Sequence, residues 1–247
     1  LYARVAPELY LKRLVVGGFE KVYELNRNFR NEGLSQRHNP EFTMLEFYVA
    51  YMDVNGMMDL AVTMIQDAVA KANNGSLVVK YGENEIDFGN FERITMLKAV
   101  LRFLPKVPSI TVDESWFEDR EKLRLLYHVG ITNGVLIPTE DGEGLQQTPE
   151  EIWEYVTTES LPETRLGKEA ILLFLFEEFV EPNLIQPTFI VEYPKSISPL
   201  SKADPSNPNI AERFELFING MEVANGFSEL NDPKEQYERF VDQMSER

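Results

Sequence analysis

The fold is decided by residues 22–51, which read VYELNRNFRNEGLSQRHNPEFTMLEFYVAY. Tyr23 and Leu25 begin a series of large side chains at every second position, and polar residues occupy the positions between them. This alternation is typical of a strand with one polar face. A polar stretch over residues 31–40 precedes a second extended run, residues 41–51, rich in aromatic and branched side chains. We therefore predict an antiparallel hairpin with a long loop.

Helices are predicted on both sides of this hairpin. Pro7 and Glu8 suit the first turn of a helix over residues 7–16, which Gly17 and Gly18 end. After Asp53, apolar side chains at 3.6-residue spacing predict a helix that stops before Asn73-Asn-Gly75. A small hairpin over residues 77–88 and a helix over residues 94–103 follow.

The middle of the chain changes character. Residues 113–181 show helical periodicity around residues 117–129, 149–158 and 166–180, with a Gly-rich acidic link at residues 139–144. This pattern predicts a helical insertion over residues 111–186. The insertion divides a core whose two parts are residues 1–110 and residues 187–247.

Extended patterns return after the insertion. Residues 187–194 predict a strand, and the Ser/Pro/Asn-rich residues 195–209 a surface-exposed, mobile loop. Asn219-Gly220 then separates two short extended runs, which is a strong signal for a two-residue hairpin turn. A last helix begins at Asp232-Pro233. Strands followed by helices, without regular βαβ alternation, favour an α+β fold with an antiparallel sheet.

The composition of the 247 residues excludes several classes of protein. Lysine and arginine number 24 against 41 acidic residues, and the resulting net charge of −17 repels nucleic acid at long range. The absence of cysteine excludes disulfides, thiolate zinc sites and a cysteine nucleophile, and favours the cytoplasm. The longest strongly apolar run, residues 170–176, is far below the roughly 20 residues of a membrane span. Because the chain begins with Leu1, we expect a piece of something longer.

One strand face carries an unusual charge. Alternation places Glu46 on the same face as Phe42, Met44 and Tyr48. Removing a carboxylate from water is costly unless the group is paired or hydrogen-bonded. Glu46 therefore requires a cation.

A second group of carboxylates lies near the Asn219-Gly220 turn. Across that turn residue 217 would face residue 222 and residue 215 would face residue 224, which places Glu215 and Glu222 diagonally on one face, roughly 7–8 Å apart. Such a pair could share a divalent cation, and oxygen ligands favour magnesium over zinc. Two solvated glutamates at a sheet edge would give the same pattern, so spacing leaves both interpretations open.

The residues after this pair do not obey simple alternation. Strict alternation would separate Asn225 and Glu229 from Glu222, and Gly226 is a candidate for a bulge that re-aims them. Walker, Gly-x-Gly-x-x-Gly, His-Glu-x-x-His and Gly-x-Ser-x-Gly patterns are absent from the sequence. The residues alone thus indicate an anion-plus-metal site of unknown task.

The segments Phe29-Arg-Asn-Glu-Gly33 and Arg37-His-Asn-Pro-Glu-Phe-Thr43, with Glu46, resemble motif 2 of class II aminoacyl-tRNA synthetases. Residues 6–14, 22–48 and 212–232 narrow the resemblance to bacterial-type lysyl-tRNA synthetases, and it covers essentially the whole chain. It implies the antiparallel class II sheet flanked by helices, with a helical insertion. The sheet would be incomplete, because motifs 1 and 3 and the anticodon-binding barrel have no counterpart here.

The resemblance also implies roles for individual residues. At ATP, Arg30 would bind the α-phosphate as the catalytic residue, and the other contacts would be Glu32, Arg37, His38, Asn39 and Phe42. Glu215 and Glu222 would hold Mg²⁺. Around lysine, Glu8 would bind the α-amino group and Glu46 with Glu229 the ε-ammonium, in a pocket lined by Tyr48, Asn225 and Phe227.

The implied activity is that of a lysine–tRNA ligase, which forms lysyl-adenylate from lysine and ATP and transfers the lysyl group to the 3′ end of its tRNA. This reaction needs no side-chain nucleophile. The full-length enzyme would be a cytoplasmic homodimer that binds tRNA(Lys), with no membrane partner. The alternatives are a non-catalytic fragment or lysine-binding module, and a paralogue that lysylates a protein. His128, Trp116 and Trp153 are interpreted as structural.

Overall fold

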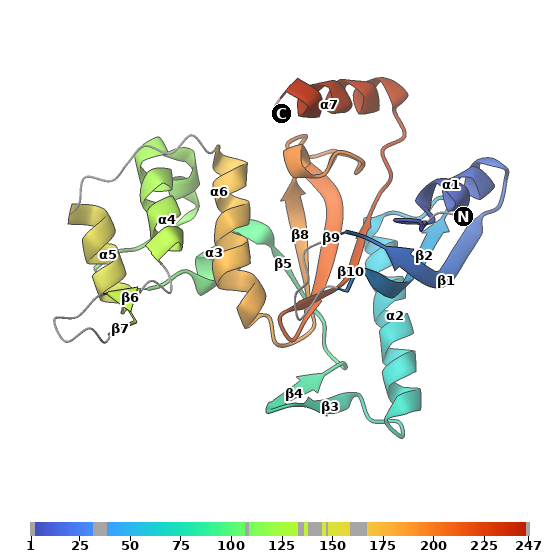
Figure 1. Cartoon of the computed structure of the whole chain (residues 1–247), viewed down its shortest axis with the longest axis horizontal. Coiled ribbons are helices and arrows are strands. Elements are labelled where there is room, and N and C mark those ends of the chain that lie inside the picture. The colour runs from blue at the N-terminus through green and yellow to red at the C-terminus, as the bar shows by residue number, and fades with distance from the viewer. Residues whose placement is uncertain are drawn as a thin grey trace. The chain divides into compact units, whose positions relative to one another are not determined.

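The structure is a computed structural model that describes residues 3–31, 39–106, 109–132, 136–137, 145–146, 148–158 and 167–245. The order of its helices and strands, shown in Figure 1, confirms the predicted α+β class. The chain divides into two compact units, Leu1–Gly56 and Met57–Arg247. In the described ranges, every helix is too short or too polar to cross a membrane.

The first unit is the predicted hairpin with a helix packed on it. Strands β1 (Lys21–Phe29) and β2 (Glu41–Val49) pair antiparallel over their full lengths, from Lys21 opposite Val49 to Phe29 opposite Glu41. Helix α1 (Glu8–Val16) contacts both strands and buries Leu11. The N-terminal segment runs beside β1, since the Phe29 amide donates to the Arg4 carbonyl at 2.8 Å. These elements confirm the hairpin and the helix predicted before it.

A long helix and a small hairpin connect the hairpin to the rest of the chain. Helix α2 (Val54–Ala72) begins after Asp53, whose side chain accepts a hydrogen bond from the Gly56 amide at 2.8 Å. This capping interaction confirms the predicted start of the helix. Strands β3 (Val78–Tyr81) and β4 (Asn84–Asp87) form the small antiparallel hairpin that was expected.

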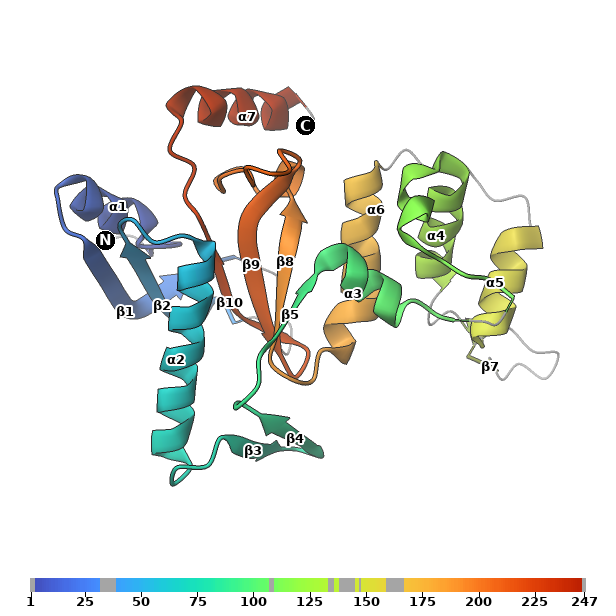
Figure 2. The ribbon, with the colours of Figure 1, turned by 180° about the vertical axis from the view of Figure 1, so that it is seen from behind.

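The second unit is built on a four-stranded sheet in the order β10-β9-β8-β5, seen from behind in Figure 2. Its strands are β5 (Glu92–Thr95), β8 (Thr188–Pro194), β9 (Ile210–Ile218) and β10 (Met221–Phe227). The last three pair antiparallel as predicted, whereas β5 runs parallel to β8. The helices between β5 and β8 make this possible, because parallel neighbours need a crossover connection.

One predicted boundary is wrong. The helix expected over residues 94–103 is strand up to Thr95, and helix α3 covers Met96–Phe103. The Thr95 hydroxyl caps this helix by accepting a hydrogen bond from the Lys98 amide at 3.3 Å. Ile94 is buried in the sheet rather than on a helix face, a difference that a short apolar run does not reveal by periodicity.

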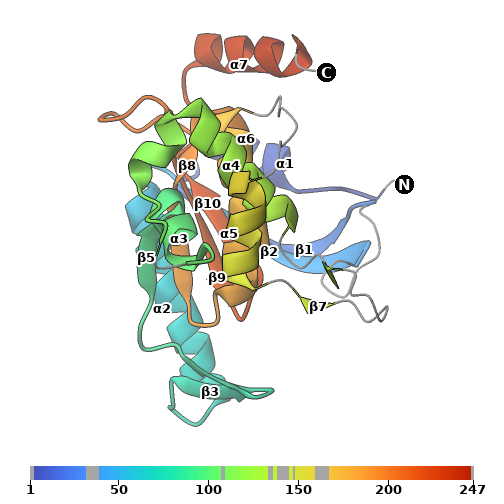
Figure 3. The same cartoon turned by 90° about the vertical axis from the view of Figure 1, so that its left-hand side faces the viewer.

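The segment between β5 and β8 is mainly helical in its described residues, as its periodicity predicts. Its elements are η1 (Glu114–Glu118), α4 (Arg120–Thr132), α5 (Pro149–Thr158), α6 (Lys168–Leu175), the π-helical turn η2 (Phe176–Val180) and η3 (Glu181–Asn183). Short strands β6 (Leu136–Ile137) and β7 (Leu145–Gln146) were not predicted. Helix α4 lies between α5 and α6, with α4 and α5 side by side in Figure 3. The acidic link at residues 139–144 lies outside the described residues.

The core of the second unit joins the insertion to the sheet. Trp153 is 2% exposed, and its indole N–H donates to the Pro105 carbonyl at 2.9 Å. The Trp116 ring meets Trp153 edge-on with ring centres 5.9 Å apart. His128 is buried within α4. These positions support the structural roles expected for the three side chains.

Part of the segment before β9 is buried, which its Ser/Pro/Asn-rich composition does not predict. Residues 205–209 are exposed, as predicted, but Ser198 and Ser201 are each 2% exposed. The short helix η4 (Lys195–Ile197) opens this segment. Helix α7 (Pro233–Ser245) follows β10, and Asp232 caps it by accepting from the Lys234 amide at 2.8 Å, as expected.

Candidate functional site

In the first unit, strand β2 presents the alternating face that the sequence predicts. Phe42, Met44 and Glu46 are half-buried, while the residues between them are exposed. The Tyr48 hydroxyl donates to Glu46 Oε1 at 2.7 Å. Across the hairpin Glu46 faces Glu24, whose own charge is balanced by Arg4 at 2.6 Å. Among the described residues, no cation pairs with Glu46.

Arg30 and Phe42 lie together at the other end of this hairpin. The Arg30 guanidinium carbon is 5.4 Å from the centre of the Phe42 ring, within cation–π range. The Arg30 Nε also donates to the Val5 carbonyl at 3.3 Å. The structure therefore brings together two of the residues expected at ATP. Asn39 is exposed, whereas Glu32, Arg37 and His38 lie outside the described residues.

Glu8 is held by a neighbour on its own helix. The Lys12 ammonium lies 2.6 Å from Glu8 Oε1, one helical turn away, and 5.8 Å from the centre of the Tyr48 ring. Lys12 thus lies between Glu8, which was expected at the α-amino group of lysine, and Tyr48, which donates to Glu46. Sequence reasoning did not single out Lys12, although its i,i+4 spacing from Glu8 was a signal.

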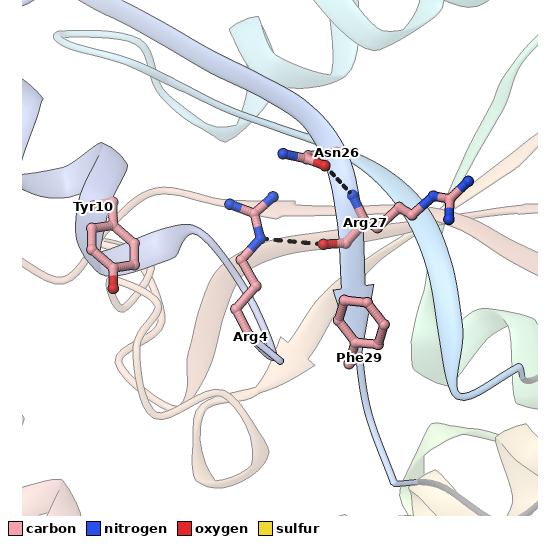
Figure 4. A pocket seen from close by; sticks show the side chains of 5 residues that line it. All are labelled: Arg4, Tyr10, Asn26, Arg27 and Phe29. Carbon is pink, nitrogen blue, oxygen red and sulfur yellow. Dashed lines mark hydrogen bonds between the residues drawn. The ribbon is translucent and has the colours of Figure 1, made fainter. Parts of the chain in front are cut away.

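An open depression in the first unit holds none of the predicted site residues. It is lined by Arg4, Tyr10, Asn26, Arg27 and Phe29, shown in Figure 4. Its two arginines are already neutralised, since Arg4 pairs with Glu24 and Arg27 with Glu41. With both positive charges balanced, the depression lacks the free charge of an anion site.

In the second unit, the β9–β10 turn brings the predicted carboxylates together. Asn219 and Gly220 have positive φ angles of 53° and 69°, as a two-residue hairpin turn requires. Glu222 lies opposite Phe217, as expected. The expectation that residue 215 faces residue 224 is wrong, because the register shifts between Glu222 and Ala224.

This shift is a bulge at Val223, and it decides which side chains share a face. Asn225 takes the position opposite Glu215, and its Nδ2 donates to Glu215 Oε1 at 3.2 Å. The bulge expected at Gly226 lies at Val223 instead, and a glycine at position 226 has a different explanation. A Cβ there would come within 2.7 Å of the Phe214 ring, so Gly226 allows close packing across the strands.

Glu215 accepts hydrogen bonds on both of its oxygens. Oε2 accepts from the Tyr193 hydroxyl at 2.7 Å, and Oε1 accepts from the Arg213 guanidinium as well as from Asn225. The side chains of Arg213 and Glu215 are only 18% and 12% exposed, and Tyr193 is 1% exposed. Glu215 is thus a largely buried carboxylate with hydrogen bonds to both oxygens.

The electrostatics of this group reflect two acids held close together. Glu222 is exposed as a residue, but loss of solvent around its carboxyl, followed by the negative charge of Glu215, raises its pKa to about 7. Burial and the Glu215 charge also raise the pKa of Glu177 on η2. Burial chiefly, with the same charge, raises the pKa of Tyr193, which stays a neutral donor. Excess negative charge at this site favours a cation.

The donor set fits magnesium better than a transition metal. Glu215 and Glu222 offer carboxylate oxygens alone, and Mg²⁺ is usually held by one or two carboxylates together with water and substrate phosphates. In the part of the chain that the structure describes, no group of three or more acidic or histidine side chains could hold a metal ion. Any further ligands of the ion would then come from a substrate or from water.

The remaining predicted residues follow along β10 and beyond it. Phe227 lies opposite Arg213 in the register. Glu229 forms an antiparallel bridge with Ser201, and the Ser228 amide donates to the Glu212 carbonyl at 2.9 Å. Phe227 and Glu229 are partly buried. The 198–201 segment therefore braces the backbone that carries both side chains.

Sequence reasoning missed Arg213 and Tyr193. The alternation of Arg213, Glu215 and Phe217 along one strand was a usable signal, since it places a cation beside the first carboxylate. Tyr193 gave no such signal, because it lies on a different strand and reaches Glu215 only through the β8–β9 pairing.

The sequence is similar to known proteins along its whole length. Residues 1–247 match the family of class II tRNA synthetases (D, K and N). Proteins named lysine–tRNA ligase from Dichelobacter nodosus and Magnetococcus marinus are each 46% identical over 99% of the chain. The lysine–tRNA ligase of Aliivibrio salmonicida is 47% identical over 99% of the chain. The chain spans 42% of the length of the first two and 44% of the third.

Proposed function

Because the chain belongs to the class II tRNA synthetases of the D, K and N group, we propose that it is the part of a lysine–tRNA ligase that activates lysine. In the proposed reaction the lysine carboxylate attacks the α-phosphorus of ATP, pyrophosphate leaves, and lysyl-adenylate forms. The lysyl group then passes to the terminal adenosine of tRNA(Lys). The relatives' shared name at 46% identity supports lysine as the substrate.

The observation that carries this proposal is the state of Glu46. Its Oε1 is fixed by the Tyr48 hydroxyl at 2.7 Å, and no cation among the described residues balances its charge. A lysine ε-ammonium supplies that charge. Charge-assisted hydrogen bonds contribute about 1.5–3 kcal/mol each, so a site built on such a carboxylate rejects neutral amino acids strongly.

The ATP end is assigned to Arg30 and Phe42 in the first unit. A fixed guanidinium stabilises the negative charge that grows on the α-phosphate during displacement. The Phe42 ring, 5.4 Å from that guanidinium, offers a surface for the adenine base. Glu32, Arg37, His38 and Asn39 are proposed as further ATP contacts.

The second unit would supply the magnesium ligands and more of the lysine contacts. Glu215 and Glu222 would hold Mg²⁺, which balances phosphate charge when bound. Asn225, Phe227 and Glu229, together with Glu8 of the first unit, are proposed lysine contacts. Binding and orientation of the reactants then account for catalysis, without a nucleophilic side chain.

Wider features of the enzyme are also proposals. The protein would act in the cytoplasm as a homodimer and meet tRNA(Lys) through the full-length enzyme. The core would comprise residues 1–110 and 187–247, and residues 111–186 would be its helical insertion.

The test is lysine-dependent exchange between ATP and pyrophosphate, with Glu46→Gln compared with the unaltered protein. Loss of lysine-dependent exchange in Glu46→Gln, with arginine and ornithine as poor competitors, is expected. Glu41→Gln is the matched control, because Glu41 lies on the same strand but on its exposed face, paired with Arg27. This variant should keep full exchange.

Other outcomes would point to the alternatives. Lysine binding in a calorimeter without exchange would indicate a lysine-binding module or an incomplete catalytic part. Exchange without transfer to tRNA, but with transfer to a protein, would indicate the paralogue. Exchange that is unchanged in Glu46→Gln would contradict the assigned lysine site.

A further inference from the structure

Arg213 already balances the charge of Glu215 within the protein. Its guanidinium pairs with Glu215 Oε1 in the interior of the second unit, where the arginine side chain is 18% exposed. The other oxygen of Glu215 is taken by the Tyr193 hydroxyl. The first carboxylate of the proposed magnesium pair is therefore already neutralised by the protein itself.

Arg213 is not a mobile surface arginine. Its Nη1 donates to the Ile197 carbonyl at 3.2 Å and to the Ser198 hydroxyl at 3.1 Å. Its guanidinium carbon lies 4.7 Å from the centre of the buried Tyr193 ring. Because contacts hold this cation on three sides, moving it away from Glu215 would break several interactions at once.

The charge balance limits what the pair can do alone. Counted alone, Glu215, Glu222 and Arg213 leave one negative charge, on Glu222, and the carboxylates of Glu177 and Glu181 add to the negative field around it. Glu215 has about four acceptor positions, and three of them are used by Arg213, Tyr193 and Asn225. A bare Mg²⁺ would meet the Glu222 carboxylate, which Asn225 also approaches, at most one unused lone pair of Glu215, and the nearby positive charge of Arg213.

We infer that Arg213 is the resident counter-ion of Glu215, and that it makes divalent-ion binding at Glu215 and Glu222 conditional on the triphosphate that accompanies the ion. The phosphates supply oxygen ligands in place of the Glu215 positions that Arg213 occupies, and they supply negative charge in place of the charge that Arg213 neutralises. The site thus takes the ion as a nucleotide complex rather than as a free ion. The triphosphate is the ATP of the proposed function, and the inference rests on that function.

The experiment is a titration with Mn²⁺, followed by electron paramagnetic resonance, at pH 8 and without nucleotide. The unaltered protein should bind Mn²⁺ weakly. Arg213→Gln, which removes the charge, should bind it on the order of tenfold more tightly, because a close like charge is lost. Arg213→Lys keeps the charge and should bind as weakly as the unaltered protein. Glu222→Gln added to Arg213→Gln should abolish the gain.

A second measurement uses the unaltered protein alone. ATP should strengthen its Mn²⁺ binding by at least the factor gained in Arg213→Gln. Equally tight Mn²⁺ binding by the unaltered protein with and without ATP would overturn the inference, even if Arg213→Gln failed to fold. Equal affinities of the unaltered protein and folded Arg213→Gln would overturn it too.

The two proposals fail in different ways. Weak Mn²⁺ binding that Arg213→Gln strengthens, in a protein without lysine-dependent exchange, would support the role of Arg213 and reject the proposed activity. Normal exchange with unchanged Mn²⁺ affinity in Arg213→Gln would do the reverse.

Discussion

Asn225 lies directly opposite Glu215 across strands β9 and β10, where regular alternation from the turn would place Ala224. The additional residue, Val223, causes this difference and brings Asn225 onto the face that carries Glu222. Phe227 then lies opposite Arg213 on the same face. One bulge therefore gathers proposed magnesium and lysine contacts that simple periodicity separates.

The raised pKa of Glu222 predicts a pH dependence of stability in the absence of divalent ions. The pKa is about 7 in the folded protein, against an ordinary value of 4.5, because of partial burial and then the charge of Glu215. The folded state therefore holds a proton that the unfolded state releases between these values. Stability is full below about pH 4.5 and falls as the pH rises towards 7.

Because Glu222 is exposed, solvent screening limits this loss to at most on the order of 1 kcal/mol. Urea unfolding with EDTA at pH 5 and at pH 7.5 measures it. Glu222→Gln should remove the dependence, whereas Glu212→Gln on β9 should retain it. A Glu222→Gln protein with the same slope as the unaltered one would show that another group titrates.

Removal of the Tyr48 hydroxyl should weaken lysine binding without affecting ATP. That hydroxyl donates to Glu46 Oε1 at 2.7 Å and fixes the carboxylate. A hydrogen bond to a charged group is worth about 1.5–3 kcal/mol, so Tyr48→Phe should raise the KM for lysine about tenfold or more. Steady-state ATP–pyrophosphate exchange measures both constants. A matching rise in the KM for ATP would argue against a lysine-specific role.

Arg30 and Phe42 should affect different kinetic constants. Arg30→Lys keeps the positive charge but loses the planar fork, so exchange should fall about 100-fold in kcat. Phe42→Leu removes the aromatic surface and should mainly raise the KM for ATP. Leu25→Ala is a suitable control, because Leu25 is 65% exposed on β1. If Phe42→Leu lowered kcat alone, the proposed adenine contact would be wrong.

The sequence predicts the local elements of this protein well, because their signals are local. Asp53 and Asp232 cap the helices that follow them, and Asn219-Gly220 turns the hairpin as its composition requires. What escapes prediction depends on contacts between distant segments. The parallel pairing of β5 with β8 is one such feature, and the hydrogen bond from Tyr193 to Glu215 is another.

In the candidate site too, the sequence predicts what depends on local geometry and misses what depends on contacts between distant segments. Alternation identified Glu46 and the Glu215–Glu222 pair, because both follow from strand geometry. The bulge at Val223 leaves no composition signal, and the more conspicuous Gly226 drew the prediction instead. Its actual role, room for the Phe214 ring, depends on a neighbour across the sheet.

Trp153 should contribute more to stability than Trp116, although the two rings touch. Trp153 is 2% exposed and bonded to the Pro105 carbonyl, whereas Trp116 is only partly buried. Trp153→Ala should lower the free energy of unfolding by about 3–5 kcal/mol, as large core truncations do. Trp116→Ala should cost clearly less. Urea unfolding followed by circular dichroism compares them, and equal costs would contradict the packing described.

Arg239 should hold helix α7 to the segment that braces Glu229. Its Nη1 donates to the carbonyls of Ser198, Pro199 and Ser201, and its Nη2 pairs with Glu235 at 2.6 Å. The arginine side chain is 10% exposed, so solvent cannot easily replace these bonds. Arg239→Gln should therefore lower the free energy of unfolding by about 2–3 kcal/mol.

Hydrogen exchange gives a local readout of the same change. The amides of Lys202 and Leu230 bond to the Ser228 and Leu200 carbonyls, so both should exchange faster in Arg239→Gln. Lys234→Gln is the control on the same helix, because Lys234 is 85% exposed and its pair with Glu238 spans 3.9 Å. Such a surface pair contributes about 0–1 kcal/mol. Faster exchange confined to α7, with Lys202 and Leu230 unchanged, would show that Arg239 stabilises the helix but not the segment beside Glu229.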